Sequence, residues 1–427
     1  MLIFVTGAQG FIGRALVAAL RARGHAVLAG VHRRNPAQRD VHLVEVDFTR
    51  DLDPGLWAPR LAGVDAVCNT VGILREHGTQ TFARVHVDAA VALFDACARL
   101  RIQRVVQLSA LGADAEATTD YHRTKRAADD ALLARIPSAW CAQPSLVFGA
   151  GGASARLFTM LASLPVLPVP GRGEQRVQPI HVDDLVHALC VLLERAPGDG
   201  GRVTLVGPAP ITLRGLLTGL RAGLRLPPAA VLEVPRPLVA AGAALGEYVP
   251  RLLLDRASLR MLERGNTADA GPTAALLGHA PRAVDAFIAR DAADALRAQA
   301  RLGWLLPILR VSVGIVFIVT GALSLGVYPV ADSYALLERT GAPRALWPPL
   351  LYGAALLDLA LGVLVFVLHG PPRRWLWRAQ AALIAGYTVI ITWRLPEFWL
   401  HPYGPVLKNL PLLALLVMLD VLEERRR

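Results

Sequence analysis

The feature that most constrains this chain is an uncharged apolar run near its C-terminal end. Residues 311–331 contain no charged side chain, and about 20 apolar residues allow a helix to cross the hydrocarbon core of a bilayer. Three further apolar segments follow at 346–368, 375–393 and 405–422. The alternative is a helical bundle buried in a soluble protein, but uncharged runs of this length are rare in soluble cores. The sequence therefore predicts an all-α, four-helix transmembrane domain over 301–427.

The charges between the predicted spans set their orientation. Arg373 and Arg374 lie between the second and third spans, and residues 425–427 are all arginine. The loop 329–345 has no net positive charge. Most of the eight tryptophans fall near span ends, where amphipathic rings favour the membrane interface. Because positively charged loops remain in the cytoplasm, we expect a multi-pass protein of the inner (cytoplasmic) membrane with both termini cytoplasmic.

Composition excludes several classes of function. Charged residues make up 19% of the chain, against about 25% in soluble domains. The formal net charge is +11, but no long basic run is present, so we expect no nucleic-acid partner. The four cysteines are widely spaced, which argues against a disulfide framework or a zinc ribbon. No metal site is predicted.

The N-terminal half alternates short apolar runs with helical patterns, which is typical of a parallel α/β sheet. Residues 2–5 fit a buried strand better than a signal peptide, because no basic segment precedes them. We expect an α/β fold with a doubly wound parallel Rossmann sheet over 1–200, followed by a small substrate-side lobe and linker over 201–300. The further predicted strands are Ala26–Val31, His42–Val46, Ala66–Val71, Arg104–Leu108 and Trp140–Val147.

A glycine-rich turn follows the first predicted strand. Its glycines are Gly7, Gly10 and Gly13, and an amphipathic helix continues to Gly24. A turn of this kind lets backbone amides and the helix N-terminus meet a pyrophosphate, so the segment predicts a dinucleotide site. The candidate cofactor-binding residues are Gly7, Gln9, Gly10, Phe11, Ile12, Arg33, Asp47, Val71, Lys125 and Pro144.

The end of the second predicted strand favours NADP(H) over NAD(H). An acid there selects the ribose of NAD, whereas an arginine suits the 2′-phosphate of NADP. The sequence places Arg33 and Arg34 at this point, with no acid before Asp40. A solvated turn is the alternative interpretation. Asp47 follows the third strand, where its carboxylate either accepts the adenine amino group or caps the strand end.

Tyr121 and Lys125 form the candidate catalytic pair. Residues four apart lie on one face of a helix, and a nearby cation is expected to lower the pKa of the phenol. Tyr121 would then serve as a general acid or base on a carbonyl or alcohol oxygen, while Lys125 holds the nicotinamide ribose. Ser109, at the carboxyl edge of the fifth strand, either orients the substrate oxygen or caps a loop.

These segments resemble the short-chain dehydrogenase/reductase superfamily, and in detail its atypical NDUFA9-like branch, which includes an accessory subunit of respiratory complex I. The resemblance implies a Rossmann domain, NADP(H) and a Ser109–Tyr121–Lys125 triad. His86 stands where related enzymes often have asparagine. The apolar segment after residue 300 resembles a DoxX-like membrane domain. The resemblance is carried by residues 5–13, 107–113, 121–125, 143–149 and 179–184, and by 407–411 for the DoxX-like part.

Three further features leave alternatives open. His181, Asp183, Asp184 and His187 suit the start of a helix better than a metal site. Asp358, inside the second span, needs a partner, and Arg310 is the candidate. The arginine- and leucine-rich stretch 251–264 fits either an amphipathic helix lying on the membrane or a packed helix of the lobe.

Taken together, the sequence predicts a membrane-anchored, NADP(H)-dependent oxidoreductase acting on a carbonyl, alcohol or quinone of a lipophilic small-molecule substrate. Similarity to accessory subunits leaves a second hypothesis, a redox-silent NADPH-binding scaffold that partners a membrane complex. A nucleotide-sugar epimerase or dehydratase is the third.

Overall fold

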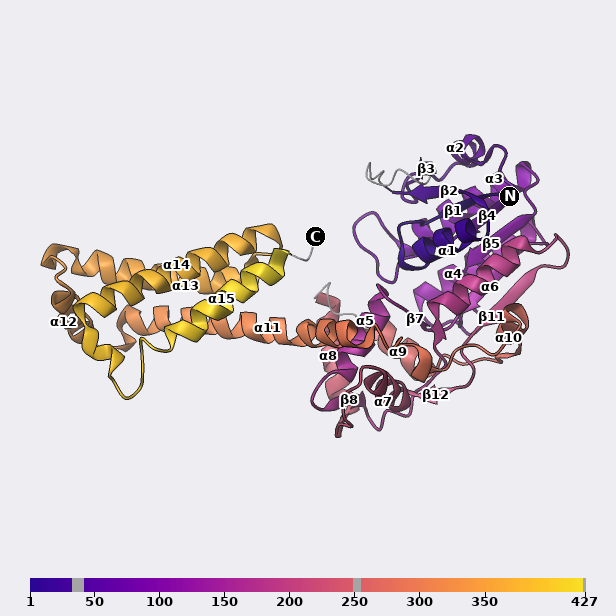
Figure 1. Ribbon diagram of the computed structural model, residues 1–427. Helices are drawn as coiled ribbons and strands as arrows, with labels where there is room; N and C mark the ends of the chain where they lie inside the picture. The colour runs from indigo at the N-terminus through magenta and orange to yellow at the C-terminus, as the bar shows by residue number, and fades with distance from the viewer. Residues whose placement is uncertain (33–41, 249–254, 425–427) are drawn as a thin grey trace. The chain divides into compact units, whose positions relative to one another are not determined.

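The computed structural model describes residues 1–32, 42–248 and 255–424. The chain divides into two compact units, Met1–Ala300 and Arg301–Arg427, and each is described here by itself. Figure 1 shows that the first unit contains the sheet and its helices, whereas the second is helical throughout.

The first unit is built on a seven-stranded parallel sheet with the strand order β11-β6-β5-β4-β1-β2-β3. The order reverses on either side of β1, which confirms the predicted doubly wound Rossmann sheet. The central strands are apolar and almost entirely buried, as expected for a sheet covered on both faces. The strands are β1 (Leu2–Thr6), β2 (Ala26–Val31), β3 (His42–Glu45), β4 (Ala66–Asn69), β5 (Arg104–Leu108), β6 (Trp140–Pro144) and β11 (Gly201–Leu205).

Two apolar layers hold helices against the sheet. On one face, α1 (Phe11–Ala22) and α6 (Val182–Glu194) share a core with the strands. On the other, Trp57 is fully buried edge-on to Phe4 and Phe48. The helices of this second layer are α2 (Pro54–Trp57), α3 (Ala89–Arg99) and α4 (Asp120–Arg135), with the short turns η1 (Ala58–Leu61) and η2 (Ala83–Asp88).

A smaller lobe is assembled from three two-stranded sheets and four helices. Because α6 and β11 return to the large sheet, the lobe takes residues from both sides of 182–205, and a single division near residue 200 does not separate sheet from lobe. Its elements are β7 (Val147–Phe148), α5 (Ala153–Ala162), β8 (Leu167–Pro170), β9 (Arg176–Val177), β10 (Ile180–His181), β12 (Ile211–Thr212), α7 (Leu213–Gly223), β13 (Val231–Val234), α8 (Arg236–Tyr248) and α9 (Arg256–Arg264), followed by α10 (Gly271–Leu277) and η3 (Val284–Ala286).

The stretch 251–264, considered above as a membrane-surface helix, lies only partly within the described residues. Its described part forms α9, in which Leu262 packs against the apolar core of the lobe. Arg264 donates to both carboxylate oxygens of Asp114, at 2.7 and 2.8 Å, and to the carbonyl of Gly112. These contacts favour the packed-helix alternative for α9.

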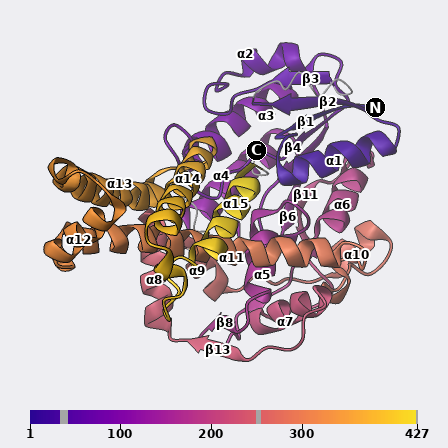
Figure 2. The same ribbon diagram turned by 60° about the vertical axis from the view of Figure 1, so that its left-hand side comes forward.

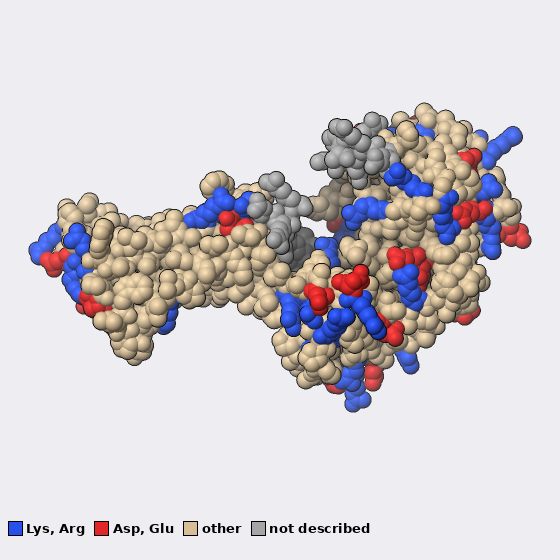
Figure 3. Space-filling view, in the orientation of Figure 1, with Lys and Arg blue, Asp and Glu red and all other residues tan. Residues whose placement is uncertain are grey.

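The second unit is a helical bundle. Its helices cover all four predicted spans, and a shorter helix, α12, lies between the first two. Ala293–Val327 and Arg344–Val367 are long and apolar enough to cross a membrane. Figure 3 shows a surface almost free of charge along the middle of this unit. The helices are α11 (Ala293–Ala322), η4 (Leu323–Val327), α12 (Val330–Thr340), η5 (Arg344–Leu346), α13 (Trp347–Val367), α14 (Pro371–Arg394), η6 (Pro396–Trp399) and α15 (Asn409–Glu424).

The predicted pairing of Arg310 with Asp358 is wrong. Arg310 on α11 instead pairs with Glu423 on α15, and Arg373 on α14 lies 3.5 Å from the same carboxylate. Asp358 is buried on the face of α13 that also carries Leu361. The prediction failed because the sequence does not show which helix ends meet in the bundle.

Candidate functional site

The glycine-rich turn between β1 and α1 has the geometry of a dinucleotide cradle. Gly7 adopts a φ of +68°, a left-handed conformation that favours glycine. A Cβ on Gly13 would lie 2.2 Å from the carbonyl oxygen of Gly7, so only glycine allows the helix to approach the turn this closely. Gly10 caps α1 and supplies no side-chain hydrogen bond to the helix N-terminus. These residues therefore fit a pyrophosphate, which the free amides at the helix start would hold.

The neighbouring candidates Phe11 and Ile12 face the protein. The ring of Phe11 is close to the positions that Cβ atoms would occupy on Gly149 and Gly152, and Ile12 packs against the first core layer. Gln9 is exposed at the tip of the turn. Phe11 and Ile12 therefore fix the path of the turn and offer a cofactor only their backbone.

The adenine end of the predicted site is described only in part. Arg33 lies outside the described residues. The Oδ1 atom of Asp47 accepts hydrogen bonds from the backbone N–H and the hydroxyl of Thr49, at 2.9 and 2.7 Å. Burial alone would raise the pKa of Asp47, but these bonds and the nearby His32 and Arg50 lower it below its usual value. Its carboxylate thus caps the turn after β3. This is the second of the two roles that the sequence left open for Asp47, the first being a contact with the adenine amino group.

Three polar residues that the sequence analysis missed lie beneath the cradle. The hydroxyl of Thr6 donates to Oδ1 of Asn69 at 2.6 Å, and Nδ2 of Asn69 donates to Oε1 of Gln107 at 2.7 Å. All three are buried, near or at the carboxyl ends of β1, β4 and β5. The sequence did carry a signal for these residues, because polar side chains stand near the ends of strands that are otherwise apolar. Those ends form the edge where such sheets bind ligands.

Lys125 is held at the centre of this edge. It is 3% exposed, and its Nζ donates to the carbonyl oxygens of Leu108 and Val71, at 3.0 and 3.2 Å. A Cβ on Gly72 would lie only 3.0 Å from this nitrogen. Burial lowers the pKa of Lys125 to about 8, against the opposing effect of the Asp129 carboxylate. Val71, a candidate cofactor-binding residue from the sequence, thus contributes to the site through its carbonyl oxygen, which accepts a hydrogen bond from Lys125.

Tyr121 lies one turn before Lys125 on α4, as predicted, but its electrostatics differ from the prediction. Its ring is half-buried, edge-on to His86 and Phe82, with centroids 5.5 and 6.2 Å away. Burial and the negative charge of Asp129 raise the pKa of Tyr121 to about 12. The expectation that Lys125 lowers this pKa is therefore wrong for this structure, because burial and the carboxylate of Asp129 both raise it.

The hydroxyl of Ser109 is engaged inside the protein. Its hydroxyl donates to Oδ2 of Asp129 at 2.6 Å, and Nε2 of Gln143 donates to the same oxygen at 3.2 Å. Oδ1 of Asp129 has no hydrogen-bond partner within the described structure. Asp129 is fully buried, and this burial raises its pKa to about 6 even though Ser109, Gln143 and Lys125 favour its charged form. Sequence reasoning missed Asp129, four residues beyond Lys125 on the same helix face.

His86 anchors the wall of the site. Its Nε2 accepts from the backbone N–H of Ile73 at 3.0 Å, and Nδ1 lies 3.0 Å from the Thr124 hydroxyl. Burial and the charge of Lys125 lower the pKa of His86 to about 3, so the ring is neutral at physiological pH. It lies in a π-helical turn, Ala83–Asp88, a distortion that is frequent at functional sites.

The remaining sequence candidates have structural roles. Pro144 is buried at the end of β6, and its carbonyl accepts from Leu111 at 2.9 Å. His181 caps α6 through its Nδ1, and Arg282 pairs with Asp183 at 2.7 Å. These contacts support the helix-start interpretation of this cluster.

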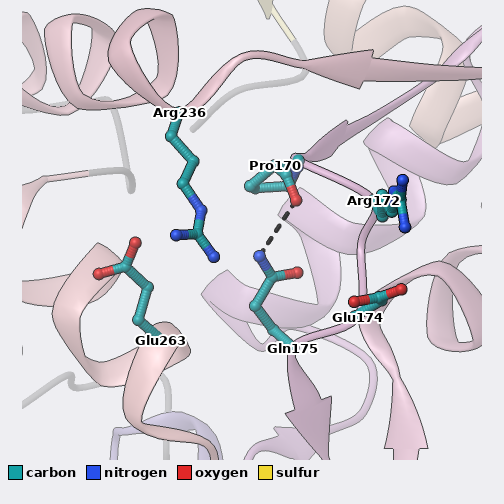
Figure 4. A pocket seen from close by; sticks show the side chains of 7 residues that line it. Pro170, Arg172, Glu174, Gln175, Arg236 and Glu263 are labelled. Atoms are coloured by element: carbon teal, nitrogen blue, oxygen red, sulfur yellow. Dashed lines mark hydrogen bonds between the residues drawn. The ribbon is translucent and has the colours of Figure 1, made fainter.

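A cavity of about 710 Å³ lies in the lobe (Figure 4). Figure 4 shows the side chain of Arg236, at the start of α8, extending between Glu263, near the end of α9, and Gln175. Gln175 donates to the carbonyl of Pro170 at 3.0 Å, and its Oε1 is buried without a partner among the described residues. The lining is Pro170, Gly171, Arg172, Glu174, Gln175, Arg236 and Glu263.

Two family models match separate parts of the chain. Residues 3–207 match the NAD dependent epimerase/dehydratase family, and residues 314–417 match the DoxX-like family. The first match covers the Rossmann sheet and the Tyr121–Lys125 pair, and the second covers most of the helical unit.

Curated relatives match part of the chain. A ceramide reductase of Caulobacter vibrioides is 37% identical over 186 residues, which are 43% of this chain and 57% of that protein. The mitochondrial NADH dehydrogenase [ubiquinone] 1 alpha subcomplex subunit 9 of Arabidopsis thaliana is 29% identical over 259 residues, 57% of this chain and 63% of that protein. The chain thus spans about three fifths of the length of each of these two relatives. An epimerase family protein of Mycobacterium bovis is 28% identical, over 61% of this chain and 91% of that protein.

Solved structures share the fold of the N-terminal unit. A nucleoside-diphosphate-sugar epimerase from Staphylococcus aureus superposes with a TM-score of 0.55 at 15% identity, over 67% of this chain and 99% of that one. A UDP-glucuronic acid 4-epimerase from Bacillus cereus gives 0.52 at 17% identity, over 71% and 100%. At these identities the likeness establishes the fold alone.

We expect Gly13→Ala to abolish tight dinucleotide binding. The added Cβ would meet the Gly7 carbonyl at 2.2 Å and push α1 away from the turn. Titration of the purified full-length chain with NADPH, followed by nucleotide fluorescence, should show affinity weakened by about tenfold or more. Gly198→Ala is the matched control, since nothing lies within 4 Å of its added Cβ. Unchanged affinity in Gly13→Ala would show that the turn does not hold the cofactor.

We expect His86→Gln to reduce the sensitivity of the fold to acid. Since the folded pKa of His86 is about 3 and the ordinary value is 6.5, the unfolded chain takes up a proton below pH 6.5 that the folded chain refuses. The contribution of neutral His86 to the free energy of unfolding is fully present above pH 6.5. Below pH 6.5 it falls by about 1.4 kcal/mol per pH unit. The melting midpoint in detergent should therefore drop less between pH 7 and 5 in His86→Gln than in the wild type. Parallel curves would contradict this assignment.

Proposed function

We propose that this chain, an epimerase/dehydratase-type Rossmann unit joined to a DoxX-like segment, is an NADP(H)-dependent reductase held at a membrane. Its substrate is a carbonyl group on a lipophilic molecule, which it interconverts with the alcohol. The observation that carries the proposal is the placement of Tyr121 and Lys125 on α4, at the carboxyl edge of the sheet that carries the glycine cradle. Ligands bind at this edge in open α/β sheets.

The chain's own residues divide the work of such a site. Gly7, Gly10 and Gly13 form the cradle for the pyrophosphate, and the bound nicotinamide supplies or accepts the hydride. Lys125 lies ready to hold a ribose hydroxyl, since the carbonyls of Val71 and Leu108 fix its ammonium group. Tyr121 exchanges the proton with the substrate oxygen. Because the pKa of Tyr121 is about 12, its phenol is protonated at neutral pH and acts as a general acid, which favours carbonyl reduction.

Two observations support a lipophilic substrate. The DoxX-like segment contains two helices apolar enough to cross a membrane, and it is covalently joined to the Rossmann unit. The relative from Caulobacter vibrioides is named a ceramide reductase and is 37% identical over 43% of this chain. We therefore propose a ceramide-like lipid carbonyl as the first substrate class to test, with a long-chain quinone as the second.

The preference for NADP(H) rests on the sequence after β2. The strand ends at Val31, and His32, Arg33 and Arg34 follow with no acid to accept the 2′-hydroxyl of an NAD ribose. Comparison of NADPH and NADH affinity tests this part of the proposal, and Arg33→Glu should shift the ratio towards NADH.

A redox-silent scaffold is the second candidate function. It is favoured by similarity to a subunit of a mitochondrial NADH dehydrogenase, and by the hydroxyl of Ser109, which is donated to buried Asp129 rather than presented to a substrate. Such a protein would retain NADPH and gain stability from it without oxidising it. A nucleotide-sugar epimerase would instead retain NAD⁺ and turn over without net cofactor oxidation.

We expect Tyr121→Phe to lose turnover and keep the cofactor. Full-length protein in detergent micelles or nanodiscs is supplied with NADPH and either an oxidised ceramide, a long-chain ketone or a quinone. Removal of the phenol hydroxyl should lower kcat by about 100-fold or more, as general acid catalysis predicts, with unchanged NADPH affinity. The neighbouring Arg123→Gln is the matched control, because Arg123 is exposed on the same helix.

The outcomes separate the candidate functions. Loss of NADPH oxidation in Tyr121→Phe with retained binding supports the reductase. Oxidation that Tyr121→Phe leaves unchanged overturns the assigned role of the phenol. If NADPH raises the melting midpoint of the wild type but is not oxidised in the presence of any of the three substrates, the scaffold is favoured.

We expect reductase activity to fall as the pH rises above neutrality. Burial lowers the pKa of Lys125 to about 8, so its ammonium charge is complete below that pH and lost above it, while Tyr121 stays protonated. The plot of kcat/KM against pH should therefore decline through about 8. A profile that stays level to pH 10 would show that the charge of Lys125 is not required.

A further inference from the structure

The helix α8 presents an uncharged, exposed face that no described part of its unit covers. Residues 237–246 contain no charged side chain. Val239 and Ala243 are 8% and 0% exposed and mark the buried face of the helix, which packs beside α9, whereas Leu238 and Leu245 are 64% and 66% exposed. Leu238 and Leu245 are seven residues apart, so they lie on one face of the helix.

Neighbouring segments extend the apolar surface beyond the helix. Leu232, on the strand β13 that leads into α8, is 55% exposed. Val166 directly precedes β8, which pairs with β13 in parallel, and it lies on the same outward face as Leu232. Leu74 is also 55% exposed, and the next residue, Arg75, donates to the carbonyl of Gly246 near the end of α8.

This surface lies beside the site described above. Arg75 joins the loop after β4 to both α8 and α9, because it also pairs with Asp255 at 2.7 Å. The same loop supplies the carbonyl of Val71 to Lys125 and the N–H of Ile73 to His86. At its other end, α8 begins with Arg236, which lines the lobe cavity.

Chain connectivity identifies what covers the face. Ala293 and Ala300, at the start of α11, are buried in the core of the same lobe. The helix then continues without a break into the apolar segment, up to Ala322. A short tether gives a second, weak contact a high effective concentration, so a helix too short to bind lipid alone is able to dock on the bilayer that its own chain enters.

The exposed face of α8 points to apolar rather than electrostatic docking. Exposed arginines on the neighbouring segments, Arg236, Arg256, Arg260 and Arg264, outnumber exposed Glu233 and Glu263, but Arg264 is paired with Asp114 and residues 237–246 carry no charge. The exposed face of α8 itself therefore suits the acyl-chain boundary of a membrane, while the flanking arginines lie outside that face.

We propose that α8 is a membrane-docking helix whose Leu238 and Leu245 insert into the acyl-chain boundary of the bilayer in which the C-terminal segment is anchored. Docking places the loop after β4 and the opening of the lobe cavity next to lipid. This gives the proposed reductase a route to a lipid-dissolved substrate, a consequence that rests on the proposed function. The docking itself does not depend on any reaction.

Fluorescence quenching by lipid tests the proposal on the full-length chain. The native cysteines, Cys68, Cys97, Cys141 and Cys190, are all buried, so an introduced surface cysteine is labelled selectively. Leu238→Cys and Leu245→Cys are labelled with an environment-sensitive fluorophore and placed in phosphatidylcholine nanodiscs, with or without a doxyl group on the acyl chain. Leu56→Cys, 47% exposed on α2, is the control, since Figures 1 and 2 show α2 and α8 at opposite ends of the first unit.

We expect quenching at positions 238 and 245 to exceed that at position 56 by roughly twofold or more, with a blue-shifted emission. Added phosphatidylglycerol should change it little. Equal quenching at all three positions overturns the proposal. A blue shift without doxyl quenching also overturns it, because a protein or a second copy of the chain then covers α8. Melting midpoints show that each variant is folded, and NADPH oxidation is measured separately, so an inactive protein that docks refutes only the proposed reaction.

Discussion

The buried ammonium of Lys125 is the contact on which the candidate site depends. Its two hydrogen bonds join β5 to the loop after β4, so a single side chain fixes the position of the site wall relative to the sheet. Placing a charge in an apolar interior is costly unless it is paired. Here the carboxylate of Asp129, one turn along α4, offsets part of that cost. Gly72 lies against this ammonium group, since a Cβ there would come within 3.0 Å of its nitrogen.

That arrangement explains why the remaining polar groups of the site are held as they are. With Lys125 charged nearby, His86 stays neutral and accepts a backbone hydrogen bond instead of carrying a proton. With Asp129 buried, Ser109 and Gln143 both donate to it. The site therefore exists as one coupled network, in which the protonation of Asp129 bears on both Lys125 and Tyr121.

Sequence patterns predicted the parts of this molecule that depend on local periodicity. The strands Ala26–Val31 and Arg104–Leu108 were predicted with the bounds that they have, because buried parallel strands are short, continuous apolar runs. The glycine cradle and the helical pairing of Tyr121 with Lys125 are likewise local and were found. The doubly wound order followed from the alternation of strands with helices.

The failures concern contacts between residues distant in the sequence. The partner of Arg310 lies 113 residues away. Ser109 faces Asp129 on another element, and the pKa of Tyr121 depends on burial that spacing does not reveal. Asp129 drew no prediction, because its burial follows from how the helix packs and not from its own sequence position.

Exposed apolar side chains occur in two places in the chain, on the helices of the second unit and on α8, and their arrangement differs between the two. In Ala293–Val327 and Arg344–Val367, long apolar stretches give the helices the composition that crossing a membrane needs. In α8, only one face is exposed and apolar while the opposite face packs on a Rossmann lobe, which is the pattern of an element at a boundary. An ordinary soluble reductase has no reason to leave such a face uncovered, since exposed leucines promote aggregation. The proposed docking on a bilayer gives that reason, because the same face would then give the lobe cavity access to substrates that water does not dissolve.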